Sequence, residues 1–182
     1  IYGYNEQGRE LWRVKYGMLG FSLTPRPVVG HGMIFMSTGF MKPQILALKY
    51  QGLDKPEIAW RYEKGAPTMP SPLLVGNELY FITDSGGLLT CLDAKTGVEH
   101  YRERLGGNYS SSPTFADGKI YLHNREGLTT VLKPGKKFEV LEKNQLPGKI
   151  FASLAVADRA LYLRSDTALY RIELKPAQRA AR

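Results

Sequence analysis

Three acidic side chains stand where carboxylates could do chemistry. Asp84, Glu126 and Asp166 each follow a short run of apolar residues and begin a turn-like segment. Carboxylate oxygens on loops are ligands that calcium prefers. In a turn, however, an acidic side chain far more often accepts hydrogen bonds from nearby backbone amides. We therefore interpret these residues as turn residues and predict neither a metal site nor a cofactor.

Other residues of catalytic type show no convergent spacing. The three histidines, His31, His100 and His123, stand at different points of the repeating pattern described below, so we do not expect them to share a metal. The serines of the segment YSSSP lack the G-x-S-x-G pattern of a nucleophilic serine. Glycine pairs at Gly86 and Gly106 precede no helix that could bind phosphate. The sequence predicts no catalytic residues.

The single cysteine, Cys91, excludes an internal disulfide and any metal site made of several cysteines. It lies inside an apolar segment, which favours a buried, unreactive thiol over a reactive one.

Length and charge narrow the classes further. The 182 residues are 43% apolar, enough for a substantial core, and no apolar run is long enough to cross a membrane. The net charge of +8 is spread over turns, with local concentrations only at Lys133–Lys137 and in the last eight residues. Neither is interleaved with stacking aromatics, so we expect no nucleic-acid partner.

An internal repeat is the strongest signal in the chain. Segments beginning at Arg26, Ser71, Ser112 and Ser153 share one pattern: a short apolar run, a tight turn, then an alternating apolar and aromatic run. They recur after 45, 41 and 41 residues. A period near forty with four short strands per unit is typical of a β-propeller blade. The sequence thus predicts an all-β propeller of four-stranded antiparallel blades, about four of them present.

Turn residues and alternation agree with this prediction. Residues that tolerate a positive φ stand at equivalent hairpins: Gly30 and Gly32, Gly76 with Asn77, Asp117 with Gly118, and Asp158. Alternation places Ile120 and Leu122 on one face of their strand and Tyr121 on the other. We expect neighbouring blades to cover both faces.

The segment CLDAKTGVEHY resembles the signature of the pyrroloquinoline-quinone-like (PQQ-like) β-propeller repeat. The resemblance rests on Leu92, Asp93, Ala94, Thr96 and Gly97, with Tyr101 where a tryptophan is usual, and extends to the segments that carry Trp12 and Trp60. It fades at VLKPGKKFEV and at LYRIELKP, where a fourth strand is not evident. The resemblance implies that the aromatic residues dock between blades, so Trp12, Trp60, Tyr101, Asp93 and Gly97 are expected to be structural.

The resemblance also suggests two functions. Quinoprotein dehydrogenases of this fold hold PQQ with calcium and often carry a disulfide between adjacent cysteines, which a chain with one cysteine cannot form. Other relatives have no quinone, including the lipoprotein subunit of the outer-membrane β-barrel assembly machine. We therefore favour a non-catalytic scaffold that binds a protein or peptide; the alternative is the C-terminal part of a quinoprotein dehydrogenase. Both imply a periplasmic or extracellular protein, and a membrane anchor in a preceding segment is compatible with this.

Propeller geometry predicts where a partner would bind. The turns between second and third strands share one face with the connections from each fourth strand to the next blade, and binding sites usually form on that face. The alternative is that several of these side chains pack between blades. The candidate binding residues are Met18, Phe21, Phe40, Met41, Met69, Asn108, Tyr109, His123 and Arg125.

Strand counting suggests an incomplete ring. We expect seventeen strands: a third and a fourth before Arg26, three complete blades, and a first to third strand after Ser153. Propellers of this family generally have seven or eight blades, so residues 1–174 would form about half a ring, followed by a tail at 175–182. We expect N-terminal blades of a longer polypeptide, or a second copy, to cover the ends, and apolar residues such as Leu161 and Leu163 to be exposed there.

Overall fold

The structure, a computed structural model, describes residues 1–17, 21–50 and 55–173. Every regular element in these ranges is a β-strand, so these ranges contain no helix that could span a membrane. Seventeen strands form five antiparallel sheets, which confirms the all-β prediction and the expected strand count. The C-terminal tail and Met18 lie outside the described residues.

The strands group into an N-terminal hairpin and four blades, numbered 1 to 4, each in simple up-and-down order. The hairpin consists of β1 (Tyr2–Tyr4) and β2 (Glu10–Arg13). Blade 1 consists of β3 (Val28–Gly30), β4 (Met33–Ser37), β5 (Ile45–Lys49) and β6 (Glu57–Tyr62). Blade 2 consists of β7 (Leu73–Val75), β8 (Glu78–Ile82), β9 (Leu88–Asp93) and β10 (Glu99–Arg104). Blade 3 consists of β11 (Thr114–Ala116), β12 (Lys119–His123), β13 (Leu128–Leu132) and β14 (Val140–Gln145). Blade 4 has three strands, β15 (Ala155–Ala157), β16 (Ala160–Arg164) and β17 (Leu169–Glu173).

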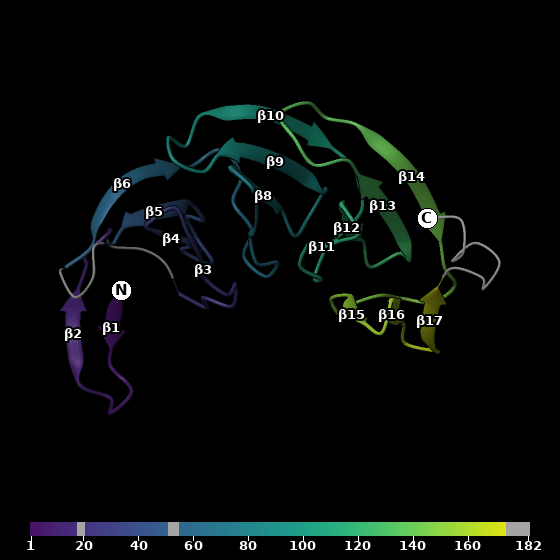
Figure 1. Cartoon of the computed structure of the whole chain (residues 1–182), viewed down its shortest axis with the longest axis horizontal. Coiled ribbons are helices and arrows are strands. Elements are labelled where there is room, and N and C mark those ends of the chain that lie inside the picture. Colours follow the sequence, from purple (N-terminus) through teal and green to yellow (C-terminus); the bar gives the residue numbers. More distant parts are fainter. Residues whose placement is uncertain (18–20, 51–54, 174–182) are drawn as a thin grey trace.

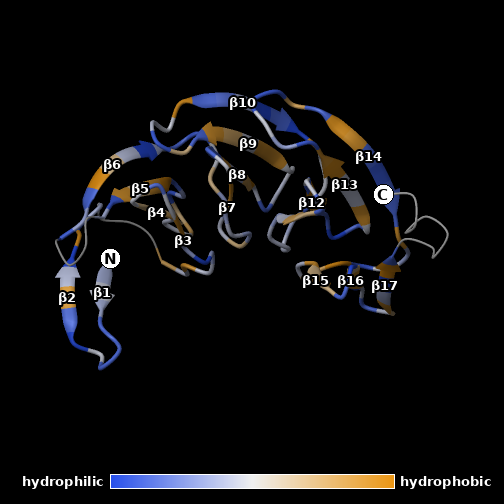
Figure 2. Cartoon of the chain, viewed as in Figure 1, coloured by the Kyte–Doolittle hydropathy of each residue, from blue (hydrophilic) through white to orange (hydrophobic). Residues whose placement is uncertain are grey.

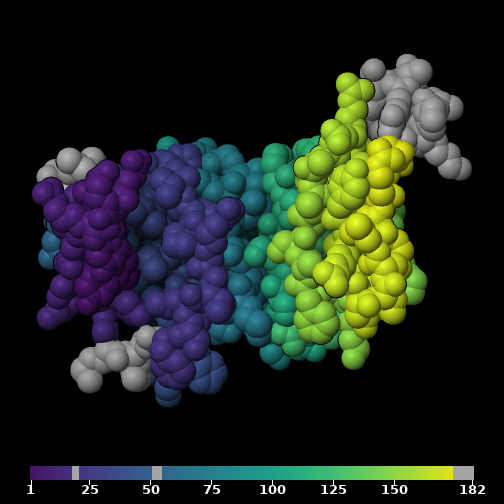
Figure 3. All heavy atoms as spheres, turned by 90° about the horizontal axis from the view of Figure 1, so that it is seen from below, coloured from purple at the N-terminus to yellow at the C-terminus, as the bar shows by residue number. Residues whose placement is uncertain are grey.

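The blades stand side by side in an open arc, with first strands on its inner side and fourth strands on its outer side (Figure 1). Seen from below, they follow one another as successive bands from the N-terminus to the C-terminus (Figure 3). Each of β3, β7, β11 and β15 begins two residues after its predicted repeat start. The arc is the partial propeller that the repeat predicted.

The middle strands of each blade form the core because neighbouring blades cover both of their faces. In β5, four successive residues, Ile45 to Leu48, are fully buried, whereas the residues of the fourth strands β10 and β14 are half-buried or exposed and mostly polar. Figure 2 shows the same contrast, with hydrophobic β5, β9 and β13 inside a largely hydrophilic β10. The buried clusters therefore lie between blades rather than within one sheet.

The hairpins between first and second strands use the predicted conformation, with one correction. Residue pairs with positive φ close three of these turns: His31 and Gly32, Asp117 and Gly118, and Asp158 and Arg159. Gly30 instead belongs to β3, and a Cβ there would lie 2.2 Å from Leu74 of blade 2. Gly30 is therefore required for close packing between blades rather than for the turn.

Serine hydroxyls join successive blades where their first strands begin. The backbone N–H of Arg26 donates to Ser71 Oγ at 2.8 Å, that of Ser71 to Ser112 Oγ at 2.9 Å, and that of Ser112 to Ser153 Oγ at 2.9 Å. The repeat positions are thus linked to one another along the inner side of the arc.

The expected exposure of Leu161 and Leu163 is wrong. Leu163 is buried and Leu161 half-buried, because their face of β16 packs against Tyr121, Ile150 and Leu154. The end of blade 4 presents the opposite face, on which Arg171 Nε donates to Tyr162 Oη at 3.1 Å. That end is more polar than the sequence suggested.

Candidate functional site: the loop face

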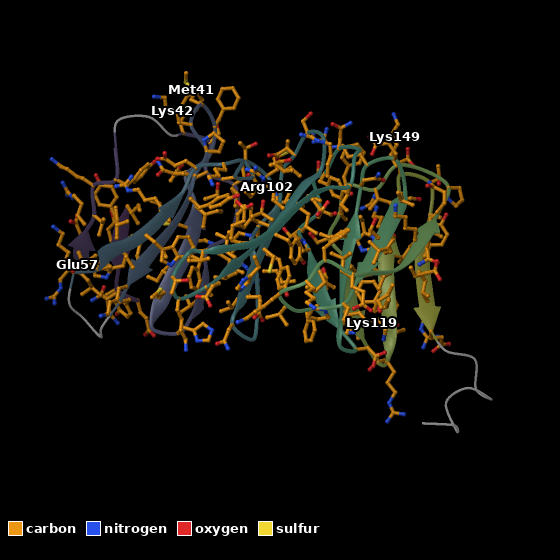
Figure 4. All side chains as sticks on the ribbon, turned by 90° about the horizontal axis from the view of Figure 1, so that it is seen from above. Met41, Lys42, Glu57, Arg102, Lys119 and Lys149 are labelled. Atoms are coloured by element: carbon orange, nitrogen blue, oxygen red, sulfur yellow. The ribbon has the colours of Figure 1, made fainter. Side chains whose placement is uncertain are left out.

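The turns after second strands and the connections between blades lie on one face of the arc, which we call the loop face. In Figure 4, Met41, Lys42 and Lys149 project from this face, and Lys119 projects from the opposite one. The described residues of the loop face are 38–44, 83–87, 124–127 and 165–168 in the turns, and 21–27, 63–72, 105–113 and 146–154 in the connections.

The three acidic residues Asp84, Glu126 and Asp166 tie the turns of blades 2 to 4 to the preceding connections. Asp84 Oδ2 accepts from the backbone N–H of Thr68 at 2.6 Å, Glu126 Oε2 from that of Asn108 at 3.1 Å, and Asp166 Oδ1 from that of Lys149 at 2.8 Å. Burial opposes ionisation of Glu126, but hydrogen bonds from Asn108 and the charge of Arg125 outweigh it and lower the pKa of Glu126. These carboxylates hold loops together, as turn chemistry predicted.

The described residues do not fit the calcium site of a quinoprotein. The three carboxylates belong to successive blades, and each binds a backbone amide of a neighbouring connection. Within residues 1–17, 21–50 and 55–173, no three histidine, cysteine, aspartate or glutamate side chains gather as a metal would require. We derive no chemistry through a metal or a quinone.

The predicted binding residues divide into exposed and buried sets. Phe21 is 53% exposed, Phe40 56% and Met41 55%, and Met69 and Asn108 are also exposed. Arg125 is half-buried. Tyr109 and His123 are only 1% and 2% exposed, so the structure does not place them on the surface.

Tyr109 and His123 are buried because adjacent blades cover them. A Cβ on Gly87 would lie 2.6 Å from the Tyr109 ring, which therefore packs directly over this glycine, and burial raises the pKa of Tyr109 to about 12. His123 shares a face of β12 with Tyr121, toward blade 4, and its Nδ1 is 2.7 Å from Thr129 Oγ1. Burial lowers the pKa of His123 to about 4.

Blade 1 differs from the other blades on the loop face. Its turn carries Phe40 and Met41 in place of a tying carboxylate, and an aromatic pair replaces the hydrogen bond. The rings of Phe21 and Phe40 meet edge to face at 5.5 Å, and the N–H of Phe40 donates to the Phe21 carbonyl at 2.9 Å. Met41 has a φ of 80°, a strained conformation for a side chain of its size. The turn of blade 1 is therefore an apolar protrusion, held in place by this ring contact and this backbone hydrogen bond.

Arg125 joins three successive connections near the inner side of the arc. Its Nε donates to Ser110 Oγ at 2.7 Å, its Nη2 lies 3.7 Å from Met69 Sδ, and its guanidinium lies 5.6 Å from the centre of the Phe151 ring. Met69, Ser110 and Phe151 are 41 residues apart and so occupy the same place in successive repeats. The predicted residues Met69 and Arg125 are therefore brought together, with Phe151 as a third neighbour that the sequence did not single out.

The residues predicted to dock blades do so where the motif is complete. Trp60 Nε1 donates to the Ala94 carbonyl at 3.1 Å, and a Cβ on Gly97 would lie 2.7 Å from the Trp60 ring. Asp93 Oδ1 accepts from the backbone N–H groups of Lys95 and Thr96 at 3.0 and 2.9 Å, which fixes the turn that Trp60 covers.

Tyr101 and Trp12 each pack near another aromatic ring. Tyr101 packs against Phe138 at 5.7 Å between ring centres, so the atypical KPGKKFE turn of blade 3 still receives an aromatic residue. Trp12 packs over Gly3 within its hairpin and lies 6.4 Å from the Tyr50 ring of blade 1. Cys91 is fully buried in the same cluster as Tyr101 and Phe138, which agrees with the expected burial, and this burial raises the pKa of its thiol to about 12.

One feature of the loop face escaped the sequence analysis. Lys149, Phe151, Ala152, Arg164, Ser165 and Asp166 line a pocket of about 220 Å³, formed by blade 4 and the connection that leads into it. Lys149 and Asp166 stand 17 residues apart, close to the spacings of 16 and 18 that separate the other tied pairs, Thr68 with Asp84 and Asn108 with Glu126. This periodic spacing is the sequence signal from which the contact between Lys149 and Asp166 could have been predicted.

Solved structures with similar folds agree with this architecture. The computationally designed Ika8 protein is 10% identical with a TM-score of 0.70, covering 93% of this chain and 50% of that one. The designed Ika4 protein is 10% identical with a TM-score of 0.68, covering 91% of this chain and 99% of that one. A europium-containing methanol dehydrogenase is 14% identical with a TM-score of 0.56, covering 67% of this chain and 24% of that one. At these identities the likeness shows the fold alone.

The chain spans half of Ika8 and about a quarter of the methanol dehydrogenase. No curated protein matches the sequence. The family of PQQ-like repeats described as outer membrane protein assembly factor BamB matches residues 1–137, which carry the hairpin, blades 1 and 2 and most of blade 3. With the repeat signature, the blade architecture and this match in agreement, the chain belongs to that PQQ-like repeat family of β-propellers.

Proposed function

We propose that the protein is a non-catalytic recognition module that binds a protein or peptide partner through its loop face. The observation that carries the proposal is the apolar protrusion of blade 1, formed by Phe21, Phe40 and Met41, each more than half exposed. Exposed aromatic and methionine side chains on a rigid scaffold are typical anchors of protein interfaces, because aromatic rings bury a large area and the flexible methionine side chain adapts to the partner surface. The family description, an outer membrane assembly factor, is consistent with binding other proteins.

The geometry of the protrusion supports a binding role over a packing role. Gly39 has a φ of 75° and a Cβ there would lie 2.7 Å from the Phe21 carbonyl, so the backbone itself holds the two rings together. The charged neighbour Lys42 projects from the same face (Figure 4). A partner with apolar side chains and a nearby acidic group would complement this tip.

A pull-down with matched variants tests this proposal. The double variant Phe40→Ser, Met41→Ser removes the apolar tip of blade 1. The control variant Val98→Ser removes a similarly exposed apolar residue from the turn after β9 in blade 2. Quantitative mass spectrometry of proteins retained from cell-envelope extracts should show a partner bound by the unmodified chain and by Val98→Ser but lost by the double variant. Equal retention of all proteins by the three chains would contradict the proposal.

We also propose that the protein works in the periplasm or outside the cell. The support is the family description as an outer membrane assembly factor. Fractionation of cells that produce the protein tests this, and recovery in the cytoplasm alone would overturn it.

The ends of the arc are further proposed contact surfaces. Tyr2 and Tyr4 stack at 6.3 Å on the hairpin, more than half exposed, and Leu169 is exposed on blade 4. We propose that further blades of the same polypeptide, or a second copy, cover these residues. Light scattering on the isolated chain tests the proposal: a stable monomer closed into a four-bladed ring would contradict it.

A further inference from the structure

The pocket formed by blade 4 and the connection leading into it is a second feature of the loop face, remote in sequence from the apolar tip of blade 1. Its volume is about 220 Å³, the size of one side chain with a few waters. Lys149 and Phe151 come from the connection between the two blades, and Arg164, Ser165 and Asp166 come from the end of β16 and the turn after it. Residues from two neighbouring repeat units thus form one pocket.

The cations of this pocket have no acidic partner in the described structure. Lys149 and Arg164 are exposed, and neither takes part in any of the five ion pairs within the described ranges. Arg164 pairs with Leu169 and so lies on the open face of blade 4, where a further blade packed on Leu169 and a ligand of the pocket would compete for it. Figure 4 shows Lys149 projecting from the loop face. Two unpaired cations beside one pocket attract an anionic group.

The carboxylates nearby are already engaged by the backbone. Asp166 Oδ1 accepts from the N–H of Lys149, and the N–H of Asp166 donates to the Lys149 carbonyl at 2.9 Å. Glu126 accepts from both the backbone N–H and the side-chain amide of Asn108. Both acids are therefore held by protein donors, but they keep their charge. With Lys149, Arg164 and Asp166 in its lining, the pocket carries two positive charges and one negative charge, and so keeps an excess of one positive charge.

An aromatic platform borders the pocket. Phe151 is 53% exposed, and the guanidinium of Arg125 lies over its ring at 5.6 Å. Arg125 adds a third positive charge, and the face of Phe151 adds apolar surface beside it. A ligand with a carboxylate next to an apolar or aromatic group would satisfy both.

We propose that this pocket binds a carboxylate of an acidic peptide segment, held by Lys149 and Arg164 with a neighbouring apolar side chain against Phe151. This inference rests on the proposed recognition function and names the chemistry of its ligand. A nucleic acid fits less well, because Asp84, Glu126 and Asp166 alternate with the cations along the loop face and would repel a continuous phosphate backbone.

A titration followed by nuclear magnetic resonance tests the proposal. The probe is the blocked peptide acetyl-Glu-Phe-Glu-Gly-amide, and its control is the same peptide with glutamine in place of both glutamates. We expect the acidic peptide to shift the amide signals of Phe151, Ala152 and Ser165 with a Kd of about 1 mM, and the glutamine peptide to produce no saturable shift.

Three single-charge variants locate the site. Arg164→Gln should weaken binding about fivefold and Lys149→Gln about threefold, since each removes one charge-assisted contact at a solvent-exposed position. Lys119→Gln, on the opposite face (Figure 4), changes the net charge equally and should alter the Kd less than about twofold. Thermal unfolding checks that all three variants remain folded.

Four results would overturn the proposal. These are equal binding of the glutamine peptide, equal weakening by Lys119→Gln, an unchanged affinity in Arg164→Gln, or tighter binding of sodium phosphate than of the peptide. The Phe40→Ser, Met41→Ser variant should bind the probe normally. Failure of the carboxylate site is therefore distinguishable from failure of the blade 1 tip.

Discussion

The joint between blades 1 and 2 and the joint between blades 3 and 4 use equivalent strands but different side chains. In the first, Trp60 lies opposite Ala47 of β5 and covers Gly97 of the next blade. In the second, the equivalent position opposite Val131 of β13 carries the exposed Glu142. The repeat fixes the backbone of both joints, and the residue at one position decides whether aromatic packing closes the outer part of the joint.

The two joints also differ in their cores. Nine buried residues form the cluster between blades 1 and 2, whereas three form the cluster between blades 3 and 4 within the described residues. A smaller apolar cluster gives less burial energy. The second joint is also where His123 is buried. The comparison indicates that the first joint is closed by a larger apolar core, whereas the last one also buries a titratable group.

Replacing Trp60, which packs over the next blade, should give the largest difference in stability between the two joints. We expect Trp60→Ala to lower the free energy of unfolding by about 3 kcal/mol, because it removes the ring packed over Gly97. The matched change Glu142→Ala should alter it by less than about 0.5 kcal/mol, since the side chain is exposed. Denaturant unfolding measures both, and equal losses would show that the two joints do not differ as described.

Lowering the pH should give the second-largest effect, a loss of folded stability that arises at the joint between blades 3 and 4. The pKa of His123 falls to about 4 in the folded state, below the usual 6.5, because burial disfavours the charged ring. The unfolded chain therefore binds a proton first as the pH falls through 6.5, and folded stability declines until about pH 4, by up to about 3 kcal/mol.

The variant His123→Gln isolates this effect. It removes the titrating group, so its stability should decline less than that of the unmodified chain between pH 6.5 and pH 4, as measured by denaturant unfolding at each pH. Identical pH profiles for the two chains would rule out His123 as the cause.

The serine links should show a smaller effect, similar at both joints. Ser71→Ala and Ser153→Ala each remove a hydroxyl that accepts a backbone N–H, at 2.8 and 2.9 Å respectively, so each should cost about 1 kcal/mol. Ser85→Ala, whose hydroxyl makes no hydrogen bond in the described structure, is the control and should be nearly neutral. A large difference between the two serine variants would mean that the contrast between the joints extends to the inner strands.

Local pattern predicted much of the molecule. Alternating apolar residues and turn residues predicted the seventeen strands. These features depend on backbone conformation and on neighbours within one repeat, which the sequence carries directly. The contact of Trp60 with Gly97 of the next blade was implied by the family resemblance instead. Propeller geometry placed Phe21, Phe40 and Met41 on the loop face, and the structure leaves each of them more than half exposed.

The sequence by itself determined the repeat, the strands, the turns and the face on which loops gather. Only the tertiary structure decided that Tyr109 and His123 are buried, that Leu163 faces blade 3, and that Lys149 and Arg164 share a pocket. The physical reason is that each depends on which side of a strand meets the next blade and on how closely that blade approaches. These quantities are set by packing between residues about forty positions apart, and the period of a single strand does not contain them.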